Sequence, residues 1–154
     1  MNVELRPFST ENQDFLFQLY ASTRMHEIGA FGWSPPQQEA FLRMQFNVQQ
    51  RWYEQAYPQA DHQIIFSEQR PIGRIMVAQE ADSIRLVDIA LLPEYRGQGI
   101  GAQLIRDLIN KAAETRQAVR LSVLRTNPAI HLYERLGFAK TSEDQMYLQM
   151  ERSI

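Results

Sequence analysis

The fold is decided by the stretch IRLVDIALLPEYRGQGIGAQLIRDLINKAAE, which occupies residues 84–114. Its first part, residues 84–92, carries aliphatic side chains on both alternating faces, which is typical of a strand buried on two sides. Pro93 ends this strand, and from Ile100 onward apolar residues recur at helical spacing, with polar residues on the other face. The centre, RGQGIG at 96–101, is therefore predicted to be a turn between a buried strand and a helix.

Glycine alternates with other residues in this turn, at positions 97, 99 and 101. Without side chains the backbone can pass close to a ligand, and the N–H groups of the first helical turn have no partners within the helix. The helix dipole adds partial positive charge and the guanidinium of Arg96 adds a full one, so we expect a phosphate or pyrophosphate ligand. The alternative is that the glycines only make a tight turn between strand and helix.

Two common phosphate-binding loops do not match this turn. The chain has no Gly-Lys-Ser/Thr sequence, which excludes the loop of nucleoside triphosphatases. A dinucleotide site needs Gly-x-Gly-x-x-Gly early in a βαβ unit, whereas here the last interval is one residue short and over half of the chain precedes it.

Residues 92–101, LPEYRGQGIG, instead resemble the coenzyme A pyrophosphate loop of the GCN5-related N-acetyltransferase (GNAT) family, Arg/Gln-x-x-Gly-x-Gly/Ala. A second stretch, NPAIHLYERLGF at 127–138, resembles the family's second signature, and the two occur in the family's order. The resemblance covers about residues 84–138. It implies a single αβ domain, the acyl-CoA N-acyltransferase fold, whose central parallel strands splay apart and admit the pantetheine arm of the coenzyme.

The rest of the chain agrees with an α+β fold, in which a mixed sheet of six to seven strands is flanked by helices. The strand of residues 84–92 should reach a parallel partner through the helix that follows it. The expected strands are residues 2–8, 62–67, 72–78, 84–92, 119–124 and 145–150, and the expected helices run from Thr10 to about Arg24, from Ser34 to about Tyr57, from Ile100 to Glu114 and within 127–138.

The second of these helices is unusually aromatic. Phe41, Met44, Val48 and Trp52 share one stripe, and further aromatic residues lie elsewhere on the helix. Packing in the core is the first interpretation of the stripe. The alternative is that part of it lines a pocket for the acceptor substrate.

Composition limits the other possibilities. With 154 residues, 44% of them hydrophobic, the chain can bury one sizeable core, and we expect one domain over residues 1–154. The formal net charge of −2 gives no reason to expect nucleic acid as a partner. No long apolar segment or signal-peptide pattern occurs, so the expectation is a cytoplasmic protein without a membrane partner.

No metal is expected. The chain has no cysteine, which excludes disulfides, thiolate metal sites and a cysteine nucleophile. His26, His62 and His131 are far apart in the sequence and lack the spacing of metal ligands.

Acetyl-CoA is the cosubstrate that the resemblance implies. The arm of the coenzyme would hydrogen-bond to the backbone near Leu91, and Asn127 would contact it, although an asparagine here is also a good helix N-cap. The expected coenzyme-binding residues are Ala90, Leu91, Leu92, Arg96, Gly97, Gln98, Gly99, Ile100, Gly101, Asn127 and Tyr133.

Transfer of an acetyl group to an amine needs a base for the protonated amine, a donor for the oxyanion and an acid for the departing thiolate. A backbone N–H near Leu91 would hold the oxyanion. The family pattern assigns the acid to Tyr133, whose alternative role is that of a core aromatic residue. All three expected catalytic residues, Tyr133, Asp88 and Glu27, are ordinary proton donors or acceptors.

Asp88 ranks first as the base because it is the one acid inside an otherwise apolar strand. Its alternative role is an ion pair with Arg85 or Arg74. Glu27 ranks second, in a loop expected to cover the acceptor, and Glu80 or Asp82 follow. A substrate that arrives neutral, with bulk water taking the proton, is a further alternative.

The function that follows is an acetyl-CoA-dependent N-acetyltransferase acting on the primary amine of a small molecule or amino acid. The region expected to hold the acceptor has aromatic residues and few acids, which disfavours a polycationic acceptor. The alternatives are a protein N-terminal or lysine acetyltransferase, and a non-catalytic acyl-CoA-binding sensor. The partners are then acetyl-CoA and an amine, with a homodimer left open.

Overall fold

The computed structural model describes residues 2–154, apart from the side chain of His26. One sheet runs through it in the order β1-β2-β3-β4-β5-β7-β6, with β4 and β5 parallel and the other neighbours antiparallel. The strands are β1 (Glu4–Pro7), β2 (Asp61–Ser67), β3 (Arg70–Gln79), β4 (Ser83–Leu91), β5 (Ala118–Leu124), β6 (Ala139–Glu143) and β7 (Tyr147–Arg152). The prediction of an α+β fold with a mixed sheet of six to seven strands is confirmed.

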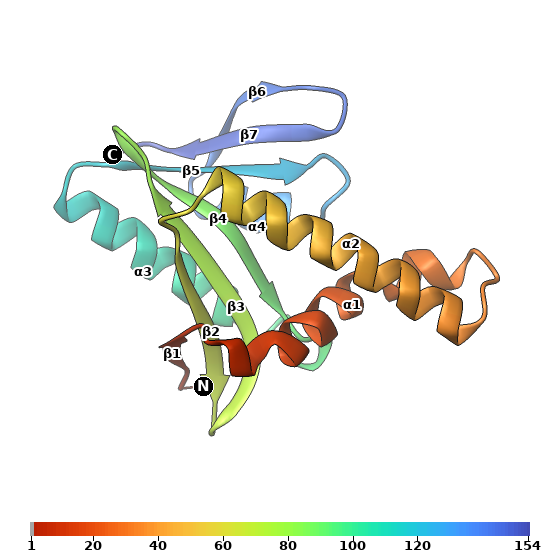
Figure 1. Cartoon of the computed structure of the whole chain (residues 1–154). Coiled ribbons are helices and arrows are strands. Elements are labelled where there is room, and N and C mark those ends of the chain that lie inside the picture. Colours follow the sequence, from red (N-terminus) through yellow and green to blue (C-terminus); the bar gives the residue numbers. More distant parts are fainter. Residues whose placement is uncertain (1) are drawn as a thin grey trace.

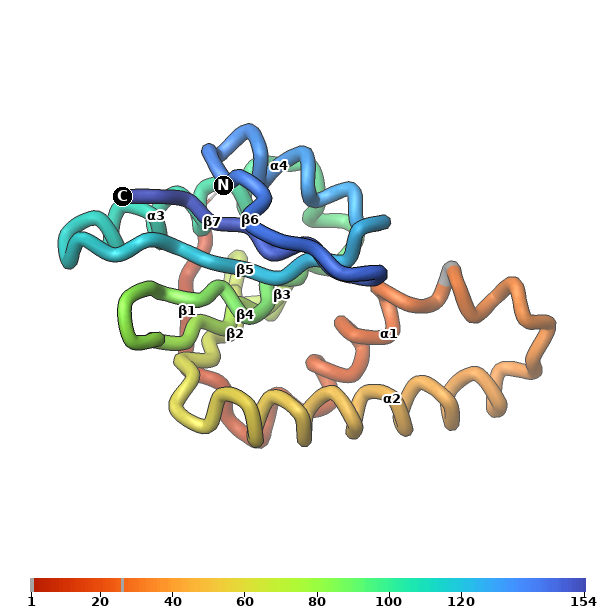
Figure 2. The backbone as a smooth tube through the Cα atoms, turned by 90° about the horizontal axis from the view of Figure 1, so that it is seen from above, coloured from red at the N-terminus to blue at the C-terminus, as the bar shows by residue number. Residues whose placement is uncertain are grey.

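Helices cover both faces of the sheet. The α-helices are α1 (Gln13–Gly29), α2 (Pro35–Ala56), α3 (Ile100–Glu114) and α4 (Ala129–Arg135), with short 3-10 helices η1 at Thr10–Asn12 and η2 at Pro93–Tyr95. In Figure 2, α1 and α2 lie on one side of the strands and α3 and α4 lie on the other. None of the helices that the structure describes has the length and hydropathy needed to span a bilayer.

The core has two parts, one on each face of the sheet. On the α3 face, the predicted apolar stripe of α3 is buried, including Leu104, Ile105 and Leu108. On the other face, Leu16 of α1 and Phe46 of α2 belong to a separate cluster of buried residues. The two helices of that face form a hairpin that projects beyond the sheet (Figure 1).

Three local predictions are corrected by the structure. The first helix runs to Gly29 rather than about Arg24, because Ile28 is fully buried and gives the helix one more turn of contact with the core. Glu27 therefore lies in a helix, not in a loop. The last part of the chain holds two strands, β6 and β7, where one was expected. The sequence did not predict β6 because all of its residues are exposed and carry no apolar pattern.

The fourth correction concerns α2. Its capping box is as predicted, with the Ser34 hydroxyl accepting the N–H of Gln37. The stripe of Met44, Val48 and Trp52, however, is not core: these side chains are 54%, 55% and 54% exposed. Helical spacing shows which residues share a face but not which face is buried. In α2 the buried face is the one that carries Leu42 and Phe46.

Candidate active site

The parallel strands β4 and β5 are paired over a short length only. Ser83–Arg85 pair with Ala118–Arg120, and beyond these residues the described chain shows no pairing between the two strands. The rest of β4 is paired with β3 alone, and the rest of β5 with β7 alone. Figure 1 shows the two strands diverging. We call the region where the two strands are not paired, Leu86–Leu91 of β4 and Leu121–Leu124 of β5, the β4–β5 opening. The family resemblance implied that the central parallel strands splay apart, as they do here.

The pairing register of β4 shows which backbone groups face the β4–β5 opening. Leu92 donates its N–H to the carbonyl of Ile72 at 2.8 Å, so its amide points to the β3 side. Amide direction alternates along a strand, so Ala90 also points to β3, whereas Ile89 and Leu91 point into the opening. Of the three predicted backbone contacts on this strand, Leu91 alone faces the opening. Ile89 is a further candidate that the sequence did not reveal, because register is not encoded locally.

The glycine turn lies at the end of β4. Gly97 and Gly99 have φ angles of +73° and +85°, a left-handed conformation that glycine adopts without strain. Gly99 is the N-cap of α3, and no side chain among the described residues caps the helix there. A Cβ added at either residue, or at Gly101, would have no heavy atom within 4 Å, so the space over this turn is open. The Arg96 Nε donates to the carbonyl of Leu91 at 3.0 Å, which holds the guanidinium beside the turn.

A β-bulge determines where Asp88 points. The pairing of β3 with β4 shifts between Met76, opposite Asp88, and Val77, opposite Leu86, so Val87 is an extra residue. Leu86 packs in the core of the α3 face, and strict alternation would send Asp88 there too. The bulge reverses the alternation, and Asp88 instead lies on the opposite face, in a pocket that residues of α1 and β3 also line.

Asp88 forms an ion pair with the buried Arg74. The Arg74 Nε lies 2.7 Å from the Asp88 Oδ2, and Arg74 is only 4% exposed. The two terminal nitrogens of Arg74 donate to the side-chain oxygens of Gln49 and Gln50 of α2, each at 3.3 Å. Of the two arginine partners considered for Asp88, the structure therefore selects Arg74, and Arg85 pairs with Glu80 instead. The Asp88 side chain keeps 27% of its surface exposed.

The charge of Asp88 acts on two tyrosines, the buried Tyr133 and the half-buried Tyr53. Burial, with a further contribution from Asp88, raises the pKa of Tyr133 to about 12. The same two causes raise the pKa of Tyr53, a residue of α2, well above its usual range. Tyr133 is on α4 and Tyr53 is on α2.

Asn127 acts as a cap in this structure. Its Oδ1 accepts the backbone N–H of Ala129 at 2.9 Å, at the start of α4. This contact realises the alternative role considered for Asn127, and it orients the helix that carries Tyr133. Tyr133 itself packs against Phe138, with ring centroids 5.8 Å apart.

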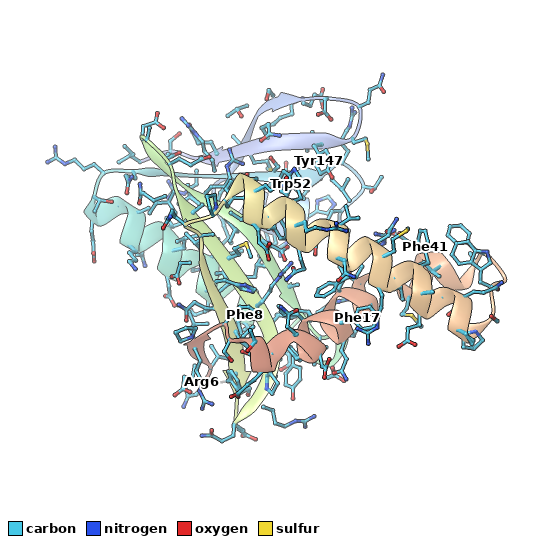
Figure 3. The ribbon with its side chains drawn as sticks, viewed as in Figure 1. Arg6, Phe8, Phe17, Phe41, Trp52 and Tyr147 are labelled. Carbon is cyan, nitrogen blue, oxygen red and sulfur yellow. The ribbon has the colours of Figure 1, made fainter. Side chains whose placement is uncertain are left out.

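A cleft of about 720 Å³ lies between α2 and the strands β4, β5 and β7; we call it the α2 cleft. Trp52 of α2 and Tyr147 of β7, both labelled in Figure 3, line this cleft. Its lining consists of Tyr20, Met44, Gln45, Val48, Gln49, Trp52, Tyr53, Tyr57, Arg85, Leu86, Val87, Ser122, Tyr147 and Gln149.

A second, smaller pocket of about 70 Å³ lies between α1 and β4 and contains Asp88 and Arg74. Tyr20 and Gln49 line both the small pocket and the α2 cleft, so the two adjoin. Glu27 lines neither of them. It is exposed on α1 and pairs with Arg24 at 3.1 Å.

Residues 59–140 match the family model described as acetyltransferase (GNAT) domain. This chain belongs to the GNAT family. No protein of curated function matches the sequence. Similar solved structures include the PaiA N-acetyltransferase of Thermoplasma acidophilum in complex with coenzyme A, which is 22% identical with a TM-score of 0.74 over 100% of both chains.

Two further GNAT-like structures span nearly the whole chain. An acetyltransferase of Thermus thermophilus is 18% identical, with a TM-score of 0.71 over 100% of this chain and 98% of that one. The ribosomal-protein-S18-alanine N-acetyltransferase of Escherichia coli is 19% identical, with a TM-score of 0.65 over 99% and 96%. At these identities the likeness is one of fold.

The family model matches one part of the site of this GNAT domain and not the other. The matched residues include β4, the glycine turn, α3 and α4, and therefore Asp88, Arg96 and Tyr133. Helices α1 and α2 precede the matched residues. The wall that α2 contributes to the α2 cleft is thus a property of this chain rather than of the family model.

His62 of β2 gives the stability of the fold a measurable pH dependence. Its ring stacks on Phe8 at 4.8 Å between centroids, and its Nε2 is buried with no hydrogen-bond partner among the described residues. Burial, helped by the nearby charge of Arg74, lowers the pKa of His62 to about 4. The folded protein therefore holds this histidine neutral.

We expect the free energy of unfolding to fall as the pH drops from about 6.5, the pKa of a histidine in an unfolded chain, toward 4. In that range the unfolded state binds a proton that the folded state does not bind. Denaturant titrations at pH 7 and pH 5 should show a smaller fall for His62→Gln than for the wild type. His131→Gln, at a side chain that is 77% exposed, should keep the wild-type fall. Equal falls in all three proteins would contradict this assignment.

Proposed function

We propose that this GNAT domain is an acetyl-CoA-dependent N-acetyltransferase that moves an acetyl group directly from coenzyme A to the primary amine of a small molecule or amino acid. The observation that carries the proposal is the β4–β5 opening, which has the glycine turn at its end and the α2 cleft on the face that holds Asp88. The similar Thermoplasma structure is a complex with coenzyme A, which supports the choice of cosubstrate.

The residues around the opening suit coenzyme A. The open space over Gly97, Gly99 and Gly101 leaves room for a pyrophosphate beside the first N–H groups of α3. The exposed guanidinium of Arg96 adds positive charge there. The N–H groups of Ile89 and Leu91 face the opening and can donate to the amides of the arm or to the oxygen of the reacting carbonyl. Acetyl-CoA supplies the activated acetyl group as a thioester.

Tyr133 is proposed as the acid. A phenol whose pKa is about 12 keeps its proton at neutral pH, so the hydroxyl is ready to donate to the sulfur of the departing thiolate. Phe138 holds the ring from one side. The buried position favours a proton transfer that does not compete with bulk water.

Asp88 is proposed as the base. Arg74 holds one carboxylate oxygen, Oδ2, and the partly exposed carboxylate retains a second oxygen that can accept the proton of an ammonium group. The small pocket beside it has room for about two water molecules of roughly 30 Å³ each, which can relay the proton. Glu27 remains the second candidate, but it lies on an exposed helix face and lines neither pocket.

A thiol-release assay with acetyl-CoA and a panel of amines tests the proposal as a whole. Release of coenzyme A that depends on an amine, together with an acetylated product, is the expected result. Binding of acetyl-CoA without turnover on any amine would instead indicate the sensor function.

Arg96→Ala should weaken acetyl-CoA binding about ten- to hundredfold, because a charged hydrogen bond to phosphate contributes on the order of 1.5–3 kcal/mol. Calorimetric titration with coenzyme A measures the change. Arg106→Ala, at an exposed residue of α3, is the control and should bind like the wild type. An unchanged affinity for Arg96→Ala would remove the glycine turn from the coenzyme site.

Tyr133→Phe should lower kcat about a hundredfold while the dissociation constant of acetyl-CoA changes little, since a positioned acid contributes that much to a proton-transfer step. The phenylalanine keeps the ring packing, so the thermal unfolding midpoint should stay close to that of the wild type. A variant that turns over at the wild-type rate would show that Tyr133 has only a packing role.

Asp88→Asn should lower both turnover and stability, because the buried Arg74 loses its counter-charge; breaking a buried pair costs about 3–5 kcal/mol, and the amide oxygen offsets part of this. The double variant Arg74→Gln with Asp88→Asn removes both charges. It should recover much of the stability, measured by denaturant titration, without recovering turnover. Recovery of both together would mean that Asp88 serves only the ion pair, and Glu27→Gln would then be the next variant to assay.

A further inference from the structure

The lining of the α2 cleft is dominated by aromatic and apolar side chains. Four tyrosines and Trp52 are joined by four aliphatic or methionine residues, and the polar remainder consists of three glutamines, one serine and one arginine. Trp52 meets Tyr53 and Tyr57 at interplanar angles of 59° and 79°, with centroids 5.4 and 5.7 Å apart. Rings at these distances and angles contact one another and form a continuous aromatic wall, against which a flat apolar group can pack.

The lining of the α2 cleft carries little charge. Its one formally charged side chain is Arg85, whose Nε is paired with Glu80 and whose Nη1 lies 3.4 Å from the Ser122 hydroxyl. No carboxylate is among the lining residues of the cleft. The adjacent small pocket contributes one carboxylate, Asp88, at the end of the cleft where the β4–β5 opening lies. An ammonium group of a bound ligand can therefore pair with Asp88, whereas a second ammonium group further along the cleft would have no carboxylate to pair with.

We propose that the acceptor of this acetyltransferase is a small aromatic monoamine, with its primary amine at the Asp88 end and its ring against the aromatic wall of the α2 cleft. This inference rests on the proposed function and specifies its substrate class. It separates the acceptor from polyamines, which need a carboxylate for each distal ammonium group. The far end of the acceptor, toward Arg85, is neutral or anionic.

Attraction of an ammonium group to aromatic faces does not reverse this preference. Such contacts contribute about 0.5–1 kcal/mol at exposed sites. The face of Tyr53 is already occupied, because the guanidinium of Arg74 lies 5.3 Å from its centroid. A second ammonium group would also lie in a cleft whose only charged lining residue is a cation.

A binding experiment tests the acceptor class without turnover. The chain has two tryptophans, and Trp33 lies apart from the cleft, packed against Phe31 and Phe41. In a Trp33→Phe variant, the emission of Trp52 should change saturably with phenethylamine in the presence of coenzyme A and should not change with spermidine. Trp52→Phe, which retains Trp33, should show no response to either amine.

Turnover provides the second test. The kcat/KM for phenethylamine should exceed the values for spermidine and for ethylamine, which lacks the ring, at least tenfold. Trp52→Ala should raise the KM for phenethylamine about three- to tenfold with little change in kcat, because it removes one aromatic contact from an exposed side chain.

A charge placed in the cleft should change the specificity in the opposite direction. Val48→Glu puts a carboxylate into the lining at a position that is 55% exposed, so the fold should tolerate it. It should raise the kcat/KM for spermidine about tenfold relative to that for phenethylamine. Gln55→Glu adds the same charge to an exposed position of α2 outside the lining, and should leave the ratio unchanged.

The outcomes separate this inference from the proposed function. If amines are acetylated but spermidine or a peptide with an aromatic N-terminus is preferred over phenethylamine, the acceptor class is wrong and the acetyltransferase function stands. If no amine is acetylated, the proposed function fails, and the Trp52 titration still decides which amine the cleft binds.

Discussion

Most of β4 has a hydrogen-bonded neighbour along one edge only. In the interior of a sheet, an unpaired backbone edge is costly because its donors and acceptors have lost water without gaining partners. Here the residues Leu86–Leu91 of β4 face the β4–β5 opening, and across it Leu121–Leu124 of β5 are paired with β7 alone, on their other edge. A ligand with a row of amides can complete this edge as an added strand would. The glycine turn follows directly after this unpaired part of β4, so the turn and the open edge are available to the same ligand.

The ion pair of Arg74 with Asp88 also links the β4 strand to helix α2. The bulge at Val87 turns Asp88 to the face covered by α1 and α2, and Arg74 fixes it there. Because the same guanidinium also binds Gln49 and Gln50, the helix that forms the wall of the α2 cleft is tied to the carboxylate proposed as base. A shift of α2 would therefore move both the acceptor and the group that takes its proton.

The sequence predicted the local backbone structure of the glycine turn and of the start of α4 better than the surroundings of Asp88 and of α2. Positive φ at Gly97 and Gly99 and the capped start of α4 are local requirements, so they leave a pattern within a few residues. The direction of the Asp88 side chain depends on a bulge, and the exposure of the stripe of Met44, Val48 and Trp52 depends on how α2 packs on the sheet. Both are set by contacts between distant segments, so no short stretch of sequence predicts them. The sequence narrowed the partner of Asp88 to two arginines, but only the register of β3 against β4 selects Arg74.

The exposed stripe on α2 then has a physical meaning that its periodicity alone could not give. Met44, Val48 and Trp52 leave more than half of their surfaces in water, which forgoes stabilisation that burial would supply. An apolar acceptor of the class proposed here would regain that free energy by covering the surface, which would then contribute to binding rather than to folding. Covering a side chain such as Trp52 can hold an acceptor with its amine near Asp88, and binding away from the reacting atoms then serves to orient them. Under the proposed function, such a cleft would select its acceptor by the apolar body, while the chemistry at the amine would be the same for any acceptor that reaches it.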